Sequence, residues 1–226
     1  STTSTISYTI DGVAQTPETG VVSNAAGTAS FNTPVLNYAT HNGKTLQITG
    51  ILITSATPNC SASFTRNVTL VVRPLPTLSG ATQSPVCSGS AATINLTGLL
   101  VSSTFTISYS IDGTAQTPVS GVNSNAAGAA SFNTPILNYA THNGKTLQIT
   151  GITVTSASPN CTVAFAQNVV LNVEPTLNPG VVGSDQSKCS PADPDPFTVI
   201  TPASGGLAPL TYQWKSSLTT GGPYTN

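Results

Sequence analysis

Charged side chains are scarce in this sequence: they make up 6% of its 226 residues, whereas an ordinary soluble domain has about 25%. The formal net charge is −1, so the chain lacks the clustered Lys and Arg of a nucleic-acid-binding surface. Aromatic residues, at 6%, are too few for a platform on which single-stranded bases could stack. No apolar run approaches the roughly 18 residues that a membrane-spanning helix needs. We therefore expect neither a nucleic-acid partner nor insertion into a membrane.

The most informative feature of the sequence is an internal repeat with a period of 101 residues. Residues 6–74 align without a gap with residues 107–175, and 51 of the 69 aligned positions are identical. The stretch LNYATHNGKTLQITGI recurs unchanged in both copies. A period of this length predicts tandem domains, because each unit is long enough to bury a core of its own.

The apolar pattern of each copy predicts an all-β fold. Residues 106–111 alternate before Asp112-Gly113, a pair typical of a two-residue hairpin turn. The alternation slips by one residue at Gly151, as it would at a β-bulge. The last strand has one apolar face, which consists of Cys161, Val163, Phe165, Val169, Leu171 and Val173. Short strands with regular turns, in a unit of about 100 residues, predict an immunoglobulin-like β-sandwich.

Proline-rich joints divide the chain into modules. The predicted domains are the C-terminal part of one sandwich (residues 1–76), a complete module (77–177) and the N-terminal part of a third, divergent module (178–226). Prolines at the joints stiffen them, so we expect the modules to form an elongated, semi-rigid rod. In the third module Trp214 stands where the earlier copies have Tyr, and we expect its side chain to fill the core.

Four cysteines, Cys60, Cys87, Cys161 and Cys189, are scattered through the sequence. With no CxxC pair and no Cys/His cluster, a zinc site is not expected, and disulfides formed in an oxidising compartment fit better. Cys87 opens the complete module and Cys161 opens its last strand. In an immunoglobulin-like sandwich these two positions lie at the same pole, so we predict a Cys87–Cys161 disulfide. By the same register Cys60 and Cys189 would pair with residues outside this sequence. A Cys60–Cys87 pairing is the rival.

The candidate catalytic residues lack the partners that such chemistry needs. His41 and His142 each precede an Asn-Gly turn, and each copy has hardly an acid that could complete a metal site or a catalytic dyad. Asp11 and Asp112 already serve as turn corners. We therefore predict that the histidines are exposed loop residues, that no cofactor is bound, and that the chain is not an enzyme.

Two further sets of residues suggest chemistry that the rest of the sequence does not support. Lys44 and Lys145 invite comparison with the Lys–Asn isopeptide bonds of some bacterial surface sandwiches, but the buried acid that promotes this bond is missing, so we predict solvated lysines. Asp185, Asp193 and Asp195 supply carboxylates of the kind that calcium prefers. Because prolines separate them, and because the joint at residues 73–86 has no acid, loop residues are the favoured interpretation.

Several stretches resemble a known family of repeats. These are SAATINLTGLL, TISYSIDGTAQTP, NGKTLQITGITVTSASPNC and the closing LTYQWKSS. They are similar to the PKD-like and immunoglobulin-like repeats of very large secreted proteins of Bacteroidota, and the resemblance covers essentially the whole chain. It implies a β-sandwich fold, export by the type IX secretion system, display at the cell surface, and roles in adhesion, gliding motility and surface filaments. No functional residue is implied, because the family has no catalytic motif to match.

Two functional hypotheses follow. In the first, the chain is a structural and adhesive stalk or filament shaft, whose partners are neighbouring modules, other copies arranged laterally, and a surface glycan or cell-surface ligand bound outside this segment. In the second, it is a spacer or carbohydrate-binding region of a secreted multidomain enzyme. An exposed row of aromatic side chains would favour the second hypothesis.

Overall fold

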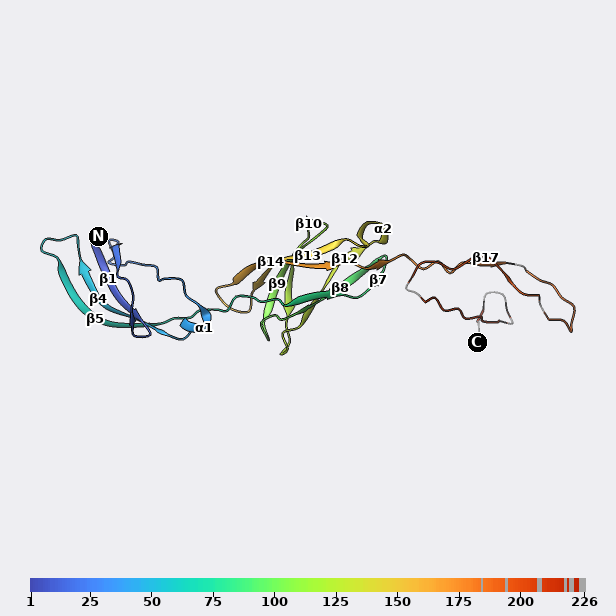
Figure 1. Ribbon diagram of the computed structural model, residues 1–226, viewed down its shortest axis with the longest axis horizontal. Coiled ribbons are helices and arrows are strands. Elements are labelled where there is room, and N and C mark those ends of the chain that lie inside the picture. The colour runs from blue at the N-terminus through green and yellow to red at the C-terminus, as the bar shows by residue number, and fades with distance from the viewer. Residues whose placement is uncertain (184, 194, 207–208, 218, 220–221, 224–226) are drawn as a thin grey trace. The chain divides into compact units, whose positions relative to one another are not determined.

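The structure is a computed structural model that describes residues 1–183, 185–193, 195–206, 209–217, 219 and 222–223. It is nearly all β, as predicted, with two helices of four residues each among the described residues. The chain divides into two compact units, Ser1–Leu75 and Pro76–Asn226, whose strands can be followed by their labels and colours in Figure 1. The predicted partition of the second unit at residue 177 stays a prediction.

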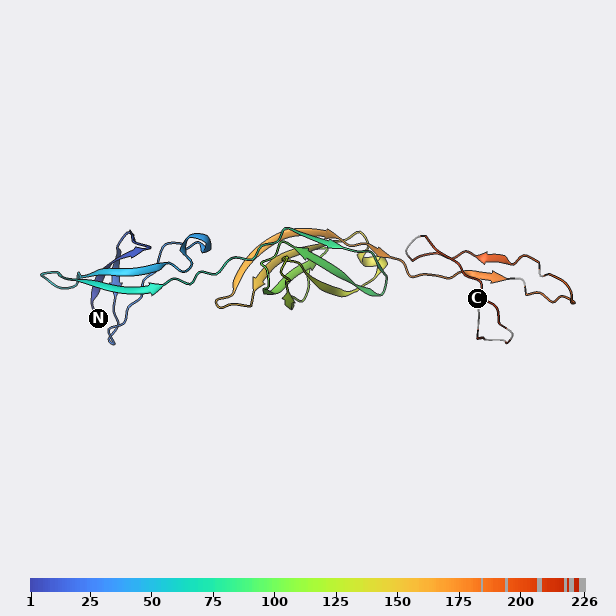
Figure 2. The same ribbon diagram turned by 90° about the horizontal axis from the view of Figure 1, so that it is seen from below.

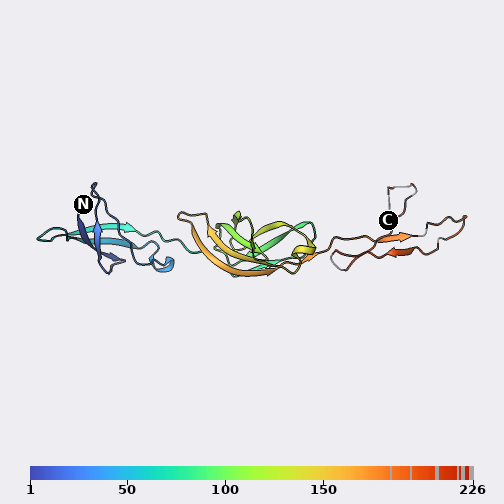
Figure 3. The same cartoon turned by 90° about the horizontal axis from the view of Figure 1, so that it is seen from above.

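The second unit contains a complete sandwich of two antiparallel sheets (Figures 1 and 3). One sheet has the order β12-β8-β6, with bounds Ala130–Leu137, Ser90–Thr97 and Gly80–Gln83. The other has the order β10-β9-β13-β14, with bounds Thr114–Ala115, Thr104–Ile111, Thr146–Val154 and Cys161–Val170, and β11 (Val119–Asn123) also pairs with β9. This division of consecutive strands between two sheets is that of an immunoglobulin-like sandwich. A parallel pair, β7 (Val86–Cys87) with β15 (Val173–Glu174), joins the first and last parts of the module.

The core of this sandwich follows the predicted alternation. Phe105, Ile107 and Tyr109 of β9 are buried, and so are Leu171 and Val173 at the end of the module. The register of β13 shifts between Ile149 and Gly151 in its pairing with both neighbours, which confirms the bulge. The predicted hairpin is also confirmed, because Asp112 and Gly113 connect β9 to β10 with positive φ angles of 49° and 78°, as a type I′ turn requires.

A second irregularity lies in β12. The register of β12 on β8 shifts between Asn133 and Ile136, around Pro135, which has no N–H to donate. At this point the backbone N–H of Ala92 donates to Oγ1 of Thr134 at 2.9 Å. Thr134 is 5% exposed, so its hydroxyl satisfies a buried donor that the bulge leaves without a carbonyl partner.

The first unit contains the equivalent of one sheet. Its order is β2-β1-β4-β5, with bounds Val13–Ala14, Thr3–Ile10, Thr45–Ile53 and Cys60–Thr69, and β3 (Glu18–Val22) also pairs with β1. No second sheet faces it within residues 1–75, and residues 24–37 run as a plain trace before the short helix α1 (Tyr38–His41), as Figure 2 shows. The buried cluster is correspondingly small and consists of Tyr8, Ile10 and Leu46.

Among its described residues, the segment from 178 onward has one pair of strands, β16 (Val181–Gly183) and β17 (Thr198–Thr201), and a bridge between Asn178 and Ser204. Trp214 is 67% exposed, so the prediction that it fills a core is wrong for this structure. Its ring stacks on Phe197, with centroids 5.8 Å apart and planes 22° from parallel. The physical reason is that no second sheet of described residues covers this pair of strands.

Candidate functional site

The polar residues that the repeat preserves meet around the helix α2 (Tyr139–His142) of the complete module. The Oδ1 atom of Asn138 accepts the N–H of Ala140 at 2.9 Å and caps the helix. In return, Nδ1 of His142 accepts the backbone N–H of Asn138 at 2.9 Å. Oγ1 of Thr141 lies 2.8 Å from the same nitrogen. One ring nitrogen of His142 thus closes the turn at the beginning of α2. His142 lies half-buried on a short helix, so the prediction of an exposed loop residue is wrong.

The turn after α2 fastens the helix to the end of the module. Oδ1 of Asn143 accepts the N–H of Val173 at 3.1 Å, and the N–H of Gly144 donates to the carbonyl oxygen of Leu171 at 2.8 Å. The first unit repeats these contacts at its own positions: Nδ1 of His41 accepts from Asn37 at 2.8 Å, and Oδ1 of Asn42 accepts from Val72 at 3.1 Å. Duplication of whole hydrogen-bond sets points to a structural role for these residues.

The lysines lie in surface ion pairs rather than free in solvent. Nζ of Lys145 lies 2.8 Å from Oδ2 of Asp112, and Nζ of Lys44 lies 2.8 Å from Oδ2 of Asp11. In the Lys145–Asp112 pair the two side chains are 44% and 59% exposed, so the pair stabilises the fold by less than about 1 kcal/mol. We did not predict these pairs, although the signal was present: an Asp-Gly turn and an Asn-Gly-Lys turn recur in both copies at the same separation.

A hollow of about 260 Å³ adjoins this cluster. Its lining is part polar and part apolar, and comprises Ile111, Asp112, Thr114, Gln116, Pro135, Leu137, Thr141 and His142. Several of its polar atoms are already engaged, because Oδ2 of Asp112 accepts from Lys145 and Nε2 of Gln116 donates to the carbonyl oxygen of Thr114 at 3.1 Å. Among the described residues no group of three or more His, Cys, Asp or Glu side chains could hold a metal ion.

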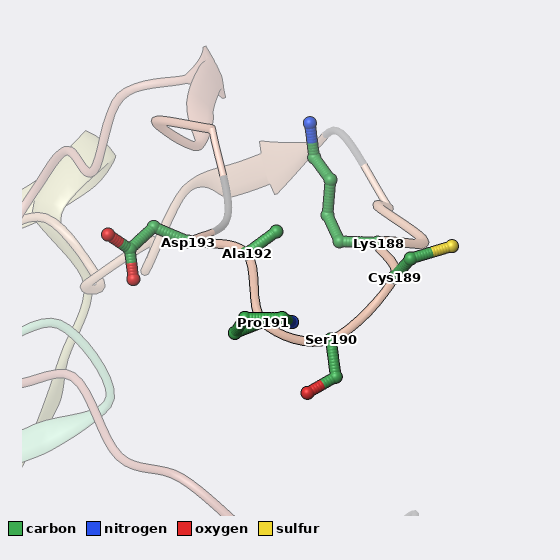
Figure 4. A pocket seen from close by; sticks show the side chains of 6 residues that line it. All are labelled: Lys188, Cys189, Ser190, Pro191, Ala192 and Asp193. Atoms are coloured by element: carbon green, nitrogen blue, oxygen red, sulfur yellow. The ribbon is translucent and has the colours of Figure 1, made fainter.

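Asp193 and Asp195 make different contacts in the segment after residue 178. Nζ of Lys188 lies 2.6 Å from Oδ2 of Asp195, and Gln186 bonds both the N–H and the carbonyl oxygen of Asp195. Asp193 instead lines an open loop together with Lys188 and Cys189. In Figure 4 the labelled side chains of this loop point in different directions rather than toward a common centre. A calcium site needs several oxygens that converge on one point, and this loop does not supply them.

The structure does not bring Cys87 and Cys161 together. All four cysteines are free thiols in it. Cys87 lies opposite Glu174 in the parallel β7–β15 pair, whereas Cys161 lies opposite Val154 at the beginning of β14. Because Cys87 pairs with Glu174, the extended chain from Cys161 to Glu174 separates the two cysteines by on the order of 40 Å. The Cα atoms of a disulfide lie within about 7 Å of each other. The predicted disulfide placed both cysteines at one pole, but the parallel pairing carries Cys87 to the other.

Burial perturbs two tyrosines of the core. Desolvation raises the pKa of the Tyr109 hydroxyl, and it raises the pKa of Tyr8, with a smaller contribution from the negative charge of Glu18. Each ring packs at a tilt against a phenylalanine, Tyr109 against Phe132 with centroids 5.1 Å apart and Tyr8 against Phe31 with centroids 5.2 Å apart. These contacts are core packing rather than an arrangement for proton transfer.

Comparison with solved structures finds a likeness in shape at low sequence identity. No family model matches the sequence, and no curated protein matches it. A solved chimeric titin Z1Z2-Z1Z2 tandem, functionalised with a GRGDS peptide from fibronectin, is 15% identical, with 76% of this chain and 84% of that chain covered and a TM-score of 0.27. The assignment of the fold rests on the strand order described above. No helix in the described part of the chain is long and apolar enough to cross a membrane.

Proposed function

We propose that this chain is a structural and adhesive repeat region of a large extracellular surface protein, where it serves as a stalk or filament shaft. The proposed parent protein is a repeat protein of the Bacteroidota. It would be exported by the type IX secretion system and act in adhesion or gliding motility. The low charge, the near-identical copies and the duplicated turn contacts support a load-bearing role. Neighbouring modules, and other copies arranged laterally, are the proposed partners.

The observation that carries the proposal is the parallel pairing of β7 with β15. The N–H of Val86 donates to the carbonyl oxygen of Asn172 at 3.2 Å, and the N–H of Ser88 donates to that of Glu174 at 2.7 Å. The side chain of Gln83 adds a bond in which its Oε1 accepts the N–H of Asn172 at 3.0 Å. After entering the module the chain forms β6 and then β7, and it leaves the module after β15.

This geometry determines how the module responds to tension. When its two ends are pulled apart, parallel strands slide along one another, so their hydrogen bonds share the load and must break together. In an antiparallel hairpin that is pulled at its open end, the bonds would break one at a time. A module built in this way resists extension, which is the property that a stalk needs.

Single-molecule force spectroscopy on the whole chain tests the proposal. Val86→Pro removes one N–H donor from the parallel pair. The control, Gln116→Pro, removes the hydrogen bond from the N–H of Gln116 to the carbonyl oxygen of Tyr109. This second bond belongs to a hairpin that does not carry the load. Each loses one bond of about 1 kcal/mol. We expect Val86→Pro to lower the unfolding force of the module much more than Gln116→Pro does. Equal losses of force would contradict the proposal.

One observation favours the alternative, a carbohydrate-binding or spacer region of a secreted enzyme. Tyr212 and Trp214 are 70% and 67% exposed, and Phe197, which stacks on Trp214, is 52% exposed. Exposed aromatic faces suit the apolar faces of sugar rings. Retention of the chain on insoluble polysaccharide would support this alternative over the stalk if Trp214→Ala abolished it. Val101→Ala, which changes another exposed apolar residue, should leave the retention unaffected.

A further inference from the structure

The turn between α2 and β13 of the complete module contains the pair Asn143-Gly144. In an Asn-Gly pair the asparagine side chain reacts readily with the next backbone nitrogen, because glycine has no Cβ atom to shield that nitrogen. Both residues are exposed to solvent, so water can reach them. The turn therefore contains the atoms, and has the access to water, that this chemistry needs.

The folded turn keeps the two reacting groups occupied and apart. The N–H of Gly144 donates to the carbonyl oxygen of Leu171 at 2.8 Å, and Oδ1 of Asn143 accepts the N–H of Val173 at 3.1 Å. Ring closure also requires the nitrogen of Gly144 to eclipse Cβ of Asn143, whereas the extended ψ angle of 131° at Asn143 holds the nitrogen away from the side chain. The reaction is therefore blocked as long as the closing segment, residues 171–173, stays in place.

The closing segment is held in turn by the parallel strand pair and by the core. Val173 belongs to β15, which pairs with β7, and the carbonyl oxygen of Asn172 accepts the N–H of Val86 at 3.2 Å. The side chain of Val173 is 0% exposed. Release of the closing segment would therefore free both reacting groups of the turn at the same time.

We propose that Asn143 is a latent modification site, which converts to aspartate or isoaspartate once the closing segment has left the module. The nitrogen of Gly144 attacks Cγ of Asn143, and a five-membered succinimide ring forms as the C–N bond of the side-chain amide breaks. Ammonia leaves and carries off the proton that the nitrogen of Gly144 loses. Water then adds to one of the two ring carbonyl groups and opens the ring. The reaction needs no reactant other than water.

The two products have different effects on the turn. Aspartate keeps an oxygen at the position of Oδ1, so it still accepts the N–H of Val173. Isoaspartate lengthens the main chain between His142 and Gly144 by one carbon atom, so the bonds to Leu171 and Val173 no longer form together. The modification therefore leaves a permanent mark on a module that has opened. This inference rests on the contacts of the turn and is independent of the proposed stalk function.

Peptide mass spectrometry of the full chain, incubated in mildly alkaline buffer, tests the proposal. Trypsin cleaves after Lys44 and Lys145, so Asn143 and the matching Asn42 of the first copy fall in different peptides. In guanidinium chloride both should react at the rate of an unfolded chain, because both lie in the sequence LNYATHNGKTLQITGI. In buffer alone we expect Asn143 to react more than about tenfold more slowly than in guanidinium chloride. Equal rates for Asn143 in the two solutions, or no reaction in guanidinium chloride, would overturn the proposal.

Matched variants test the link between the turn and the parallel strand pair. Val86→Pro removes a bond that holds the closing segment, whereas Gln116→Pro removes a bond within a hairpin elsewhere in the module. Gln83→Ala and Gln116→Ala form a gentler pair, which keeps the test decisive if a proline unfolds the module. The first loses the bond to the N–H of Asn172, and the second loses a side-chain bond within its own hairpin. We expect the first member of each pair to speed the reaction of Asn143 in buffer severalfold and the second to leave it unchanged. Equal rates within both pairs would overturn the proposal.

Discussion

Replacement of Thr134 by valine tests whether its hydroxyl holds the bulge of β12. Valine keeps the shape of threonine but removes the oxygen that accepts the N–H of Ala92 at 2.9 Å. A buried N–H left without a partner costs about 1–3 kcal/mol, and the added methyl group offsets up to about 0.8 kcal/mol. We therefore expect Thr134→Val to lower the free energy of unfolding of the complete module by about 1–2 kcal/mol.

The first unit provides a matched control in nearly the same sequence. The hydroxyl of Thr33 donates to the carbonyl oxygen of Pro34 at 3.1 Å, but no described strand pairs with residues 29–36, so Thr33 has no strand N–H to satisfy. Thr33→Val should therefore leave the stability of the first unit almost unchanged. The contrast isolates the bond to Ala92 from the intrinsic effect of exchanging threonine for valine.

Pulsed hydrogen exchange and mass spectrometry over a urea series measure each unit separately. With an m value of about 1–2 kcal/mol per M, protection of residues 90–97 should be lost at a urea concentration about 1 M lower in Thr134→Val than in the parent chain. Equal shifts for Thr134→Val and Thr33→Val, or no shift for Thr134→Val, would refute the assignment of the hydroxyl as the acceptor at the bulge.

Two other predictions follow from the same structure. Gly128→Ala should destabilise its unit more than Gly27→Ala does, by at least about 1 kcal/mol in urea unfolding. Both glycines have a positive φ, but only Gly128 lies against the carbonyl oxygen of Leu99. Equal losses of stability would show that this close approach is absent. Burial raises the pKa of the Tyr109 hydroxyl, so as the pH rises the unfolded chain loses the hydroxyl proton before the folded chain does. The contribution of Tyr109 to stability is therefore fully present below about pH 10 and is lost as the pH rises through the folded pKa. Tyr109→Phe should flatten the decline between pH 9 and 11 in urea titrations, and an unchanged slope would contradict the buried environment.

Local patterns were sufficient to predict much of the fold. The alternation from Cys161 to Val173, the Asp112-Gly113 hairpin and the slip at Gly151 all depend on interactions between near neighbours, and the structure confirms them. The pairing of Lys145 with Asp112, by contrast, depends on how two separate turns meet in space. The two turns recur in both copies at the same separation, but that separation by itself does not say that the turns come together.

The cysteines show the same limit. Their spacing suggested that Cys87 and Cys161 share a pole, but the parallel β7–β15 pair separates them by the length of the last strands. Direction of pairing is a property of the assembled module, because a strand of two residues carries no signal that distinguishes a parallel neighbour from an antiparallel one.

The sequence by itself determined the repeat, the all-β class, the turns and the residues that face inward. Only the tertiary structure decided which of these residues are buried. Residues 29–36 and 130–137 are nearly identical, yet the second segment is a strand with Leu137 fully buried and the first is an unpaired segment. The physical reason is that a strand exists through hydrogen bonds to a neighbour, and an apolar side chain is buried only when another layer covers it.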